Sequence, residues 1–237
     1  MIQTVSISFF RFPSAAARLW VLGQMGAARL DFRRMREAGF FKLCGSGKGE
    51  GFLPVPNTAV WAILATWPDA DTARDRVNAA PVYRRWRSHA SESWTVYLSA
   101  TSARGAWSGV TPFEVGDAPT DGPIAALTRA TVRPKAIAGF WGRVPQIDVV
   151  IGADPNVLFK IGIGELPWLH QVTFSIWPDL KTMHDFARAD GPHALAIRAV
   201  REHGWFREEL YARFTVLGHE GLWNGKAPLQ GSERIAA

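Results

Sequence analysis

Cysteine is almost absent from the 237 residues, with Cys44 as the only example. A single thiol excludes an internal disulfide and any cluster that needs several cysteine ligands, and it suits a reducing compartment. The N-terminal stretch MIQTVSISFFRF has no basic residue ahead of its apolar part, unlike a signal peptide. Instead Val5, Ile7 and Phe9 alternate with serines, as in a β-strand. We therefore expect a cytoplasmic protein.

Long apolar runs are also missing. The longest uncharged segment, GFLPVPNTAVWAILATWP (51–68), contains three prolines, an asparagine and two threonines. Proline removes a helical hydrogen bond, so this segment is a poor membrane-spanning helix. We predict that no segment crosses a bilayer.

Several motifs of common functions are not present. In the glycine-rich segment CGSGKGEGF (44–52), Lys48 is followed by glycine, so the phosphate-binding pattern is incomplete. The nucleophile elbow G-x-S-x-G and the zinc motif H-E-x-x-H do not occur, and neither lysine-containing strand fits the RNA-recognition signature. We predict a surface loop at 44–52, with a lid as the alternative, and no nucleic-acid partner.

A rare tripeptide, Trp-Pro-Asp, occurs at 67–69 and again at 177–179. The match extends downstream, where Trp94 aligns with Trp205 at nearly the same spacing. Self-similarity of this length predicts that the chain is built from two related halves.

Upstream, FFKLCGSG resembles LFKIGIGE, which aligns Lys42 with Lys160 and leaves an insertion of eight residues in the first half. Strands are expected near 3–10, 39–44, 58–66 and 93–100, and near 126–132, 157–163, 168–177 and 208–217. Helices are expected near 13–36, 70–88, 134–142 and 180–202.

This order predicts an α+β fold of tandem ferredoxin-like repeats within one chain. It resembles the dimeric α/β-barrel superfamily, whose ligands occupy the barrel interior. We expect a first half at 1–110, a second half at 123–224 and a disordered tail at 225–237, with a linker at 102–122.

Aromatic residues are abundant, with eleven tryptophans and fourteen phenylalanines. They predict a large aromatic core, a deep apolar tunnel, or both. The tunnel candidates lie on strands or first helices of both halves: Trp20, Phe40, Phe41, Trp61, Trp141, Phe159 and Trp168. Of these, Trp61, Phe159 and Trp168 are the candidates for substrate binding.

His193 is the first candidate for a metal ligand. In ADGPHALAIRAV it falls in the first turn of a helix after Pro192, with Ile197 and Val200 on the same face. A helix N-terminus and burial both disfavour the imidazolium, so the imidazole stays neutral and able to bind metal. In the aligned first half the counterpart is Val82.

His170 and His184 are the alternatives. His170 shares a predicted strand face with Trp168, Val172 and Phe174, and His184 ranks third. The three other histidines lie near element ends in polar surroundings and are expected at the surface: His89, His203 and His219.

Long blocks of the chain carry a family resemblance. They are RLWVLGQMGAARLDFRRMREAGFFKLCGSGKGEGFLPVPNTAVWAILATWPD, SARGAWSGVTPFEV, GPIAALTRATVRP and DPNVLFKIGIGELPWLHQVTFSIWPD. These blocks resemble the spheroidene monooxygenases, carotenoid ketolases of purple phototrophic bacteria, over about residues 3–224. The resemblance implies two hydroxylations at carbon 2 of acyclic carotenoids, spheroidene and hydroxyspheroidene, that use O2, haem and reduced ferredoxin.

Under this resemblance His193 would be the axial haem ligand, with His170 and His184 as alternatives and a Cys44 thiolate ranked below them. The net charge of +6 suits an acidic ferredoxin and anionic lipids, so we expect peripheral contact with the inner or photosynthetic membrane. The insertion GSGKGEGFLPVP is expected to border the substrate entrance. The alternatives are a non-catalytic carotenoid or lipid carrier and a cofactor-free oxygenase on the same fold.

Overall fold

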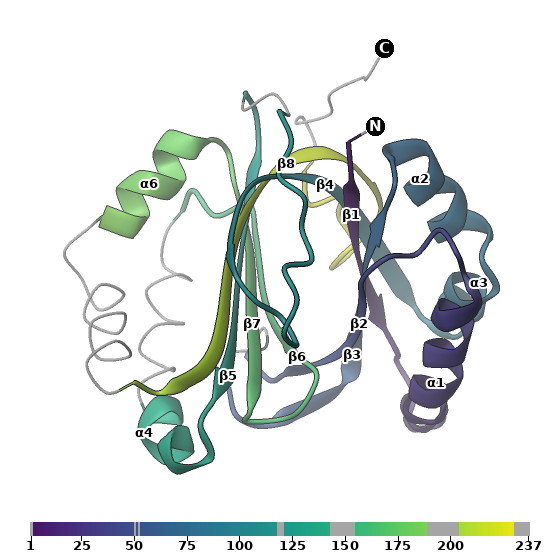
Figure 1. Cartoon of the computed structure of the whole chain (residues 1–237). Helices are drawn as coiled ribbons and strands as arrows, with labels where there is room; N and C mark the ends of the chain where they lie inside the picture. The colour runs from purple at the N-terminus through teal and green to yellow at the C-terminus, as the bar shows by residue number, and fades with distance from the viewer. Residues whose placement is uncertain are drawn as a thin grey trace.

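The computed structural model describes residues 2–49, 51, 53–117, 121–142, 155–188 and 204–229. In this part of the chain, antiparallel strands close a barrel in the order β1-β3-β2-β6-β7-β5-β8-β4 (Figure 1). The strands are β1 (Thr4–Arg11), β2 (Phe41–Gly47), β3 (Pro56–Trp67), β4 (Glu92–Gly105), β5 (Ile124–Val132), β6 (Phe159–Gly164), β7 (His170–Trp177) and β8 (Phe206–Gly221). The helices are α1 (Ala15–Arg34), α2 (Ala70–Ala79), α3 (Pro81–His89), α4 (Ile137–Trp141) after the short η1 (Pro134–Ala136), and α6 (Leu180–Arg188).

The two halves of the chain contribute four neighbouring strands each. The first half supplies β4-β1-β3-β2 and the second supplies β8-β5-β7-β6. A long pairing of β4 with β8 joins them on one side, whereas on the other side β2 meets β6 only at Gly45 with Gly164 and Ser46 with Ile163. The prediction of an α+β protein with a barrel-like core is confirmed.

The barrel interior is a packed aromatic and aliphatic core. Alternation along the strands turns every second side chain inward, and Phe9, fully buried on β1, lies at its centre. Its ring centroid is 5.3 Å from that of Phe159, 5.7 Å from Trp94 and 6.1 Å from Phe174. The predicted aromatic core is therefore present.

The seven tunnel candidates do not line one tunnel, because strand alternation sends them to different faces. Phe40 and Phe159 pack in the barrel interior. Trp20, Phe41 and Trp61 pack on the outer face of the first half, and Trp141, the last residue of α4, packs in a separate cluster with Val132 and Trp205.

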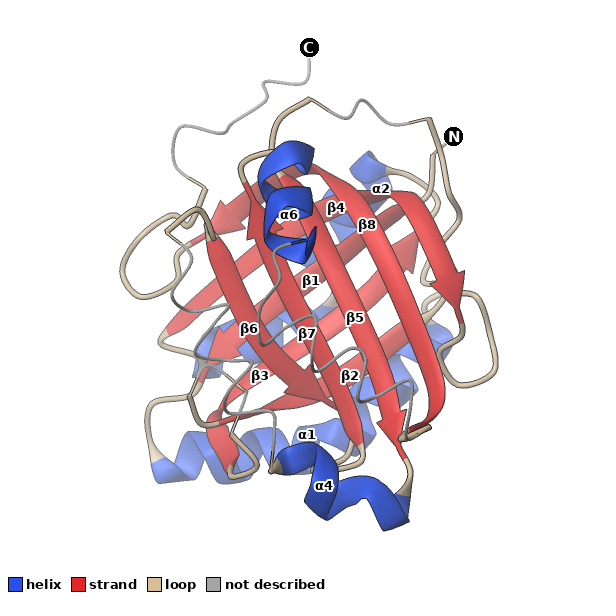
Figure 2. Cartoon of the chain, turned by 90° about the vertical axis from the view of Figure 1, so that its left-hand side faces the viewer, coloured by secondary structure: helices blue, strands red, loops and turns tan. Residues whose placement is uncertain are grey.

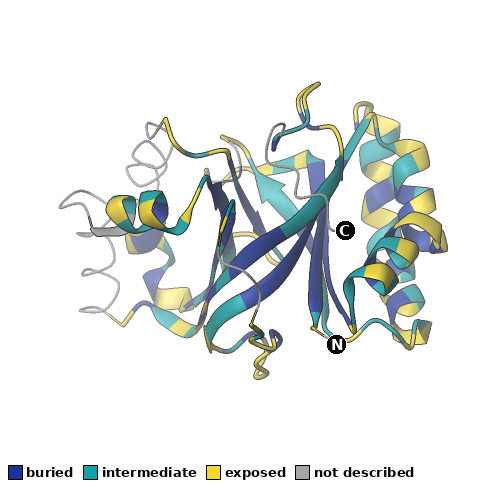
Figure 3. Cartoon of the chain, turned by 90° about the horizontal axis from the view of Figure 1, so that it is seen from above, coloured by how far each residue is buried: buried dark blue, intermediate teal, exposed yellow. Residues whose placement is uncertain are grey.

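Helices α1, α2 and α3 cover the outer face of the first-half sheet (Figure 3). Large side chains fill this layer, among them Phe10, Trp61, Ile63, Trp67 and Trp86. Burial of such aromatic rings removes the most apolar surface per residue from water. This layer is a second core.

The outer face of the second-half sheet has smaller and more polar side chains than that of the first half. On β7 it presents Gln171, Thr173 and Ser175, at the positions where β3 presents Trp61, Ile63 and Ala65. Among the described elements, α6 crosses one end of this face and α4 lies at the other (Figure 2). The described elements of the second half therefore cover this face less fully than α1, α2 and α3 cover the first.

The two Trp-Pro-Asp corners have the same local structure. Asp69 accepts a hydrogen bond from the Thr72 backbone N–H at 2.7 Å, and Asp179 accepts one from Thr182 at 2.7 Å. These N-cap bonds lower the pKa of both carboxyl groups. The prediction that each aspartate lies at a helix start is confirmed.

Two details of the internal alignment are wrong. Lys42 pairs with Leu64 and points into the barrel, whereas Lys160 pairs with Ser175 and points outward. A shift of one residue reverses the face of every side chain in a strand, and the sequence match is off by that one residue.

Trp94 and Trp205 are not equivalent either. Trp94 lies opposite Phe9 inside the barrel, and Trp205 precedes β8 and packs against Val132 and Phe140. The pairing of Val82 with His193 was obtained by counting back from these two tryptophans. Because the two tryptophans are not equivalent, that pairing is no longer supported.

The predicted linker and tail are partly built into the barrel. Strand β4 continues to Gly105, and Trp107 and Phe113 beyond it are buried in the interior core. Leu229, assigned to a disordered tail, is 2% exposed and packs against the same core, so the tail was predicted to begin too early. Apolar side chains in these loop-like segments outweighed their Gly, Pro and Ser content.

The helix predicted at 70–88 is two helices, because Pro81 begins a new one. The helix predicted at 180–202 is described only as α6, and its remainder lies outside the described residues.

Among the described helices, none combines the length and apolar character needed to span a bilayer.

Candidate functional site

Two pockets lie on the outer side of the second-half sheet. The first, of about 280 Å³, lies where β2 meets β6, beneath the insertion between β2 and β3, and we call it the seam pocket. The second, of about 690 Å³, lies between α6 and the outer faces of β5, β7 and β8, and we call it the α6 pocket. Gln171 lines the seam pocket and Thr173 lines the α6 pocket, so the two pockets are neighbours along β7.

Glycines allow the insertion to lie flat against β6. Gly51 has a φ of +96°, and a Cβ there would lie 1.7 Å from the Gly162 carbonyl oxygen. A Cβ on Gly47 would lie 2.4 Å from the Leu53 carbonyl oxygen. Only glycine fits such close backbone approaches. The segment predicted as a surface loop is therefore packed over a pocket.

We expect Gly51→Ala to displace the insertion. The new Cβ meets backbone that cannot move independently, so the free energy of unfolding should fall by about 2–3 kcal/mol. Limited proteolysis should cut near residues 48–56 sooner. Gly109→Ala is the control, since Gly109 also has a positive φ of +78° but has open space around its Cβ position. Equal losses in both variants would contradict a steric role for Gly51.

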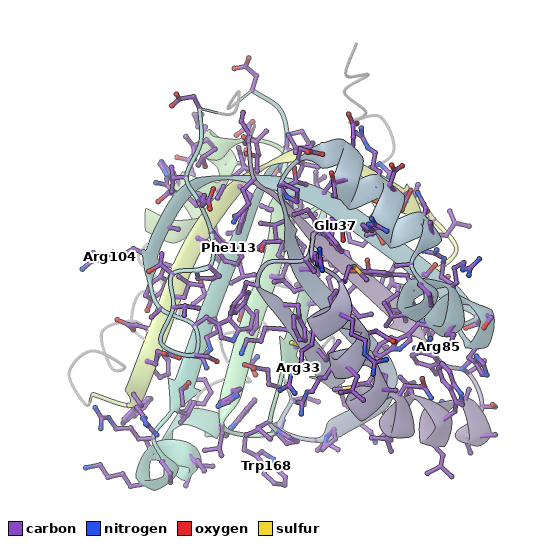
Figure 4. All side chains as sticks on the ribbon, turned by 45° about the vertical axis from the view of Figure 1, so that its right-hand side comes forward. Arg33, Glu37, Arg85, Arg104, Phe113 and Trp168 are labelled. Carbon is purple, nitrogen blue, oxygen red and sulfur yellow. The ribbon has the colours of Figure 1, made fainter. Side chains whose placement is uncertain are left out.

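Two predicted substrate-binding residues meet at the seam pocket. Trp61 lines its inner wall and donates its indole N–H to the Thr58 carbonyl at 2.8 Å. Trp168 lies at the pocket mouth, 50% exposed, with its indole N–H donated to the Pro54 carbonyl at 2.7 Å. Figure 4 places Trp168 at the end of the barrel. Phe159, the third candidate, faces the barrel interior and lines neither pocket.

A buried charged cluster closes the barrel end beside the seam pocket. Glu165, in the turn after β6, accepts hydrogen bonds from Lys42 Nζ at 2.7 Å and from the Trp107 indole N–H at 2.8 Å. His170 Nδ1 lies 3.4 Å from Glu165 Oε2, the oxygen that also accepts from Trp107. Glu165 and His170 also line the seam pocket, so the cluster forms its polar edge.

The pKa of Glu165 is lowered from its ordinary value of 4.5 to about 2. Burial by itself raises this pKa, but hydrogen bonds from His170, Lys42 and Trp107 together with the positive charge of Lys42 outweigh it. The carboxylate is therefore ionised at any physiological pH.

Arg129 continues the cluster deeper into the barrel. Its side chain is only 2% exposed, it forms an ion pair with Glu208, and it lies 5.7 Å from the Trp107 ring. Glu208 also accepts hydrogen bonds from the backbone N–H groups of Ser108 and Gly109. These residues were not predicted. The available signal was that Lys42 and Arg129 occupy inward positions of alternating strands.

Cys44 lies in the interior core and lines neither pocket. Burial raises the pKa of its thiol, followed by the negative charge of Glu165. A buried thiol with a raised pKa stays protonated, which disfavours a thiolate ligand.

The α6 pocket combines apolar walls with two cations and the carboxylate of Glu209. Trp177 comes from β7, and Met183 and Phe186 come from α6. Arg104 and Arg213 contribute guanidinium groups, and Arg104 projects from the edge of the molecule in Figure 4. Such a pocket can hold a flat apolar molecule that carries carboxylates.

The three candidate histidines have different places. His193 lies outside the described residues. His170 is at the seam pocket, and His184 is at the edge of the α6 pocket, where its Nε2 lies 3.0 Å from Arg213 Nη1. Since a guanidinium group only donates, Nε2 of His184 is the acceptor in this contact. Within the described residues no three His, Cys, Asp or Glu side chains gather as a metal site.

His219 was expected at the surface and is instead part of the barrel. Its Nδ1 accepts a hydrogen bond from the Trp94 indole N–H at 3.4 Å. Strand β8 extends to Gly221, and its register places His219 opposite Val96, on an inward position.

No family model matches the chain. Among solved structures, an aldoxime dehydratase in complex with butyraldoxime superposes with a TM-score of 0.63 at 11% identity, over 99% of this chain and 87% of that one. A second aldoxime dehydratase gives a TM-score of 0.56 at 10% identity, over 100% and 90%. At such low identity these likenesses show a shared fold.

Comparison by sequence finds relatives of much higher identity than these solved structures. The chain is 55% identical over 229 residues to the spheroidene monooxygenase of Cereibacter sphaeroides, which covers 96% of this chain and 71% of the relative. It is 52% identical over 227 residues to that of Rhodobacter capsulatus, with 94% of each covered. It is 33% identical over 211 residues to that of Rubrivivax gelatinosus, with 89% and 81% covered. The chain belongs to the spheroidene monooxygenase family.

Proposed function

We propose that this chain is a carotenoid monooxygenase that introduces a keto group at carbon 2 of spheroidene and hydroxyspheroidene. The observation that carries the proposal is the identity of 52–55% to two spheroidene monooxygenases over almost the whole chain. Two successive hydroxylations at one carbon give a geminal diol, which loses water to the ketone. In total, the CH2 group, two O2, four electrons and four protons yield the ketone and three water molecules.

We propose haem as the cofactor and reduced ferredoxin as the electron donor. When bound, haem would supply the O2 activation that side chains cannot provide. The α6 pocket fits this group, because Arg104 and Arg213 can pair with its two carboxylates and Trp177, Met183 and Phe186 provide apolar contact. An excess of basic over acidic residues, 27 against 21, favours an acidic donor protein.

The seam pocket is proposed as the substrate entrance, with the insertion as its border. Residues two apart on one strand face are about 7 Å apart, so Gln171 and Thr173 connect the two pockets along β7. A linear polyene that enters beside Trp61 and Trp168 would reach the α6 pocket along this strip. The chain's own contribution is then to hold the polyene extended on the sheet.

We also infer that the two halves derive from one ferredoxin-like unit. Each half has the order strand, helical segment, strand, strand, helical segment, strand among its described elements, with the second helical segment of the first half divided into α2 and α3. Each also places its strands in the same spatial order and caps the helix after its third strand with the aspartate of a Trp-Pro-Asp corner.

A visible spectrum combined with turnover tests this proposal. Purified protein supplied with haem should show a Soret band that shifts with carbon monoxide after reduction. It should also convert spheroidene to the 2-oxo product with ferredoxin, a ferredoxin reductase and O2. A carotenoid-bound protein without turnover would identify a carrier, and turnover without haem would identify a cofactor-free oxygenase.

The axial ligand is tested by single substitutions. We expect His193→Ala to lose most bound haem, measured as the Soret absorbance per protein, and His170→Ala to retain it, since His170 lies beside Glu165 at the other pocket. His184→Ala is the matched variant at the α6 pocket and should retain haem as well. Loss of haem in His184→Ala alone would move the ligand from His193 to His184.

A further inference from the structure

The mouth of the seam pocket is surrounded by exposed apolar side chains. They come from three separate segments: Leu22 on α1 (47% exposed), Leu53 and Val55 in the insertion (38% and 47%), and Leu166 and Trp168 in the turn after β6 (50% each). Single exposed apolar residues are normal on a soluble protein. A group that converges from three segments on one pocket mouth indicates an interaction surface.

These side chains are held in place by the fold. Trp168 adopts a φ of +64°, which is unfavourable for a bulky residue, and its backbone carbonyl accepts a hydrogen bond from the Trp141 indole N–H at 3.0 Å. Its own indole N–H is donated to the insertion. The structure thus keeps a half-exposed tryptophan in a strained conformation, which favours a role for the exposed ring.

Helix α1 is apolar on both sides. Val21 and Phe32 face the sheet, yet Leu19 and Leu30 on the solvent side are 72% and 52% exposed. A surface helix normally has polar residues there. The outward leucines of α1 extend the apolar surface beside Leu22.

Positive charge accompanies this apolar surface. Helix α1 carries four arginines and one acidic residue, Asp31, which is already paired with Arg85. Exposed Lys48 lies in the insertion, and exposed Arg133 and Lys135 lie at the start of the α4 segment. Figure 2 shows α1 and α4 along the same end of the barrel.

We propose that this end of the barrel docks on a lipid bilayer that contains anionic headgroups. The docking face consists of α1, the described residues 48–49, 51 and 53–55 of the insertion, and the turn at 165–169. Its leucines and Trp168 would enter the acyl boundary, and its arginines and lysines would contact the headgroups. A bilayer explains the open pocket mouth better than a protein partner does, because a partner would cap the pocket, whereas lipid leaves it in contact with an apolar phase.

The proposal rests on the proposed function only for the identity of the molecule that enters, an apolar polyene dissolved in the bilayer. With the pocket mouth at the acyl boundary, such a molecule reaches Trp61 without crossing water. Docking itself needs no turnover and is tested separately.

Co-sedimentation of the full chain with sucrose-loaded vesicles tests the docking. Vesicles of phosphatidylcholine with one quarter phosphatidylglycerol should bind the protein, and pure phosphatidylcholine should bind it more weakly. Leu22→Asp and Leu53→Asp should each lower the partition coefficient about tenfold, since each removes one inserted apolar side chain. Val115→Asp is the matched control. Val115 is 57% exposed, and its neighbour Glu114 donates its backbone N–H to Gln3, near the N-terminus at the opposite end of the barrel (Figure 1).

The absence of binding to any vesicle at low salt would overturn the proposal, as would an equal loss in all three variants. Light scattering distinguishes a second copy of the chain, because a dimer that Leu22→Asp dissociates would assign this face to self-association. Turnover of detergent-dissolved spheroidene separates the two proposals. If it persists while vesicle binding fails, the docking face is wrong and the proposed function stands.

Discussion

Replacing Glu165 with glutamine should lower the free energy of unfolding by about 3 kcal/mol at pH 7. The substitution leaves the Lys42 ammonium, only 14% exposed, without its carboxylate partner. A buried charge that loses its partner typically costs 3–5 kcal/mol, far more than the pair itself contributes. Urea unfolding followed by tryptophan fluorescence measures this difference.

The same variant should change the pH dependence of stability. Because folding lowers the Glu165 pKa from 4.5 to about 2, the ionised carboxylate stabilises the fold above pH 4.5. That stabilisation, about 3 kcal/mol, is lost as the pH falls through 2. The stability difference between the parent chain and Glu165→Gln should therefore shrink between pH 5 and pH 2.

The exposed pair Lys181 and Asp185 provides the control for Glu165. Their side chains are 85% and 62% exposed, although the Nζ to Oδ2 distance of 2.6 Å resembles that of the buried pair. Asp185→Asn should change stability by less than about 0.5 kcal/mol, because solvent screens the pair. Similar losses in both variants would show that burial does not determine the strength of the Glu165 cluster.

Phe9→Ala should cost about 3–5 kcal/mol of stability, since it removes the central ring of the barrel interior. The neighbouring rings of Trp94, Phe159 and Phe174 cannot all move to fill the space. Carotenoid specificity should stay unchanged in any folded fraction, because neither described pocket includes Phe9. Thermal and urea unfolding, with product analysis, measure the two effects.

Leu19→Ala serves as the comparison for Phe9, because Leu19 is 72% exposed and its truncation should change stability by no more than about 0.5 kcal/mol. If Phe9→Ala lowers the free energy of unfolding by less than about 1 kcal/mol and also alters carotenoid specificity, the prediction of an interior tunnel would be supported again. The packed interior would then be the wrong description of the barrel.

Strand and helix positions followed closely from the sequence. Alternation on β7 indicated its inward face, and the Trp-Pro-Asp corners indicated two helix starts. Both signals depend on neighbours within a few residues, such as the bond from Thr72 to Asp69. The interior ion cluster could not be predicted in this way, because Lys42 and Glu165 are separated by 123 positions.

The structure brings some of the candidate site residues together, and their roles stay predictions. Trp61, Trp168 and His170 do meet at one pocket, whereas Phe159 was separated from them by strand alternation. The repeat alignment failed at Lys160 because a one-residue shift in strand register is almost invisible in composition.

The sequence by itself determined the capped corners and the family, because N-cap hydrogen bonds and long similar blocks are both properties of neighbouring residues. Only the tertiary structure decided which face each side chain takes and where pockets open among the described residues. It also decided that an insertion and a distant turn form one pocket mouth. Closure of the barrel is the physical reason, since it brings β2 against β6 and β4 against β8 and so creates contacts that no local pattern encodes.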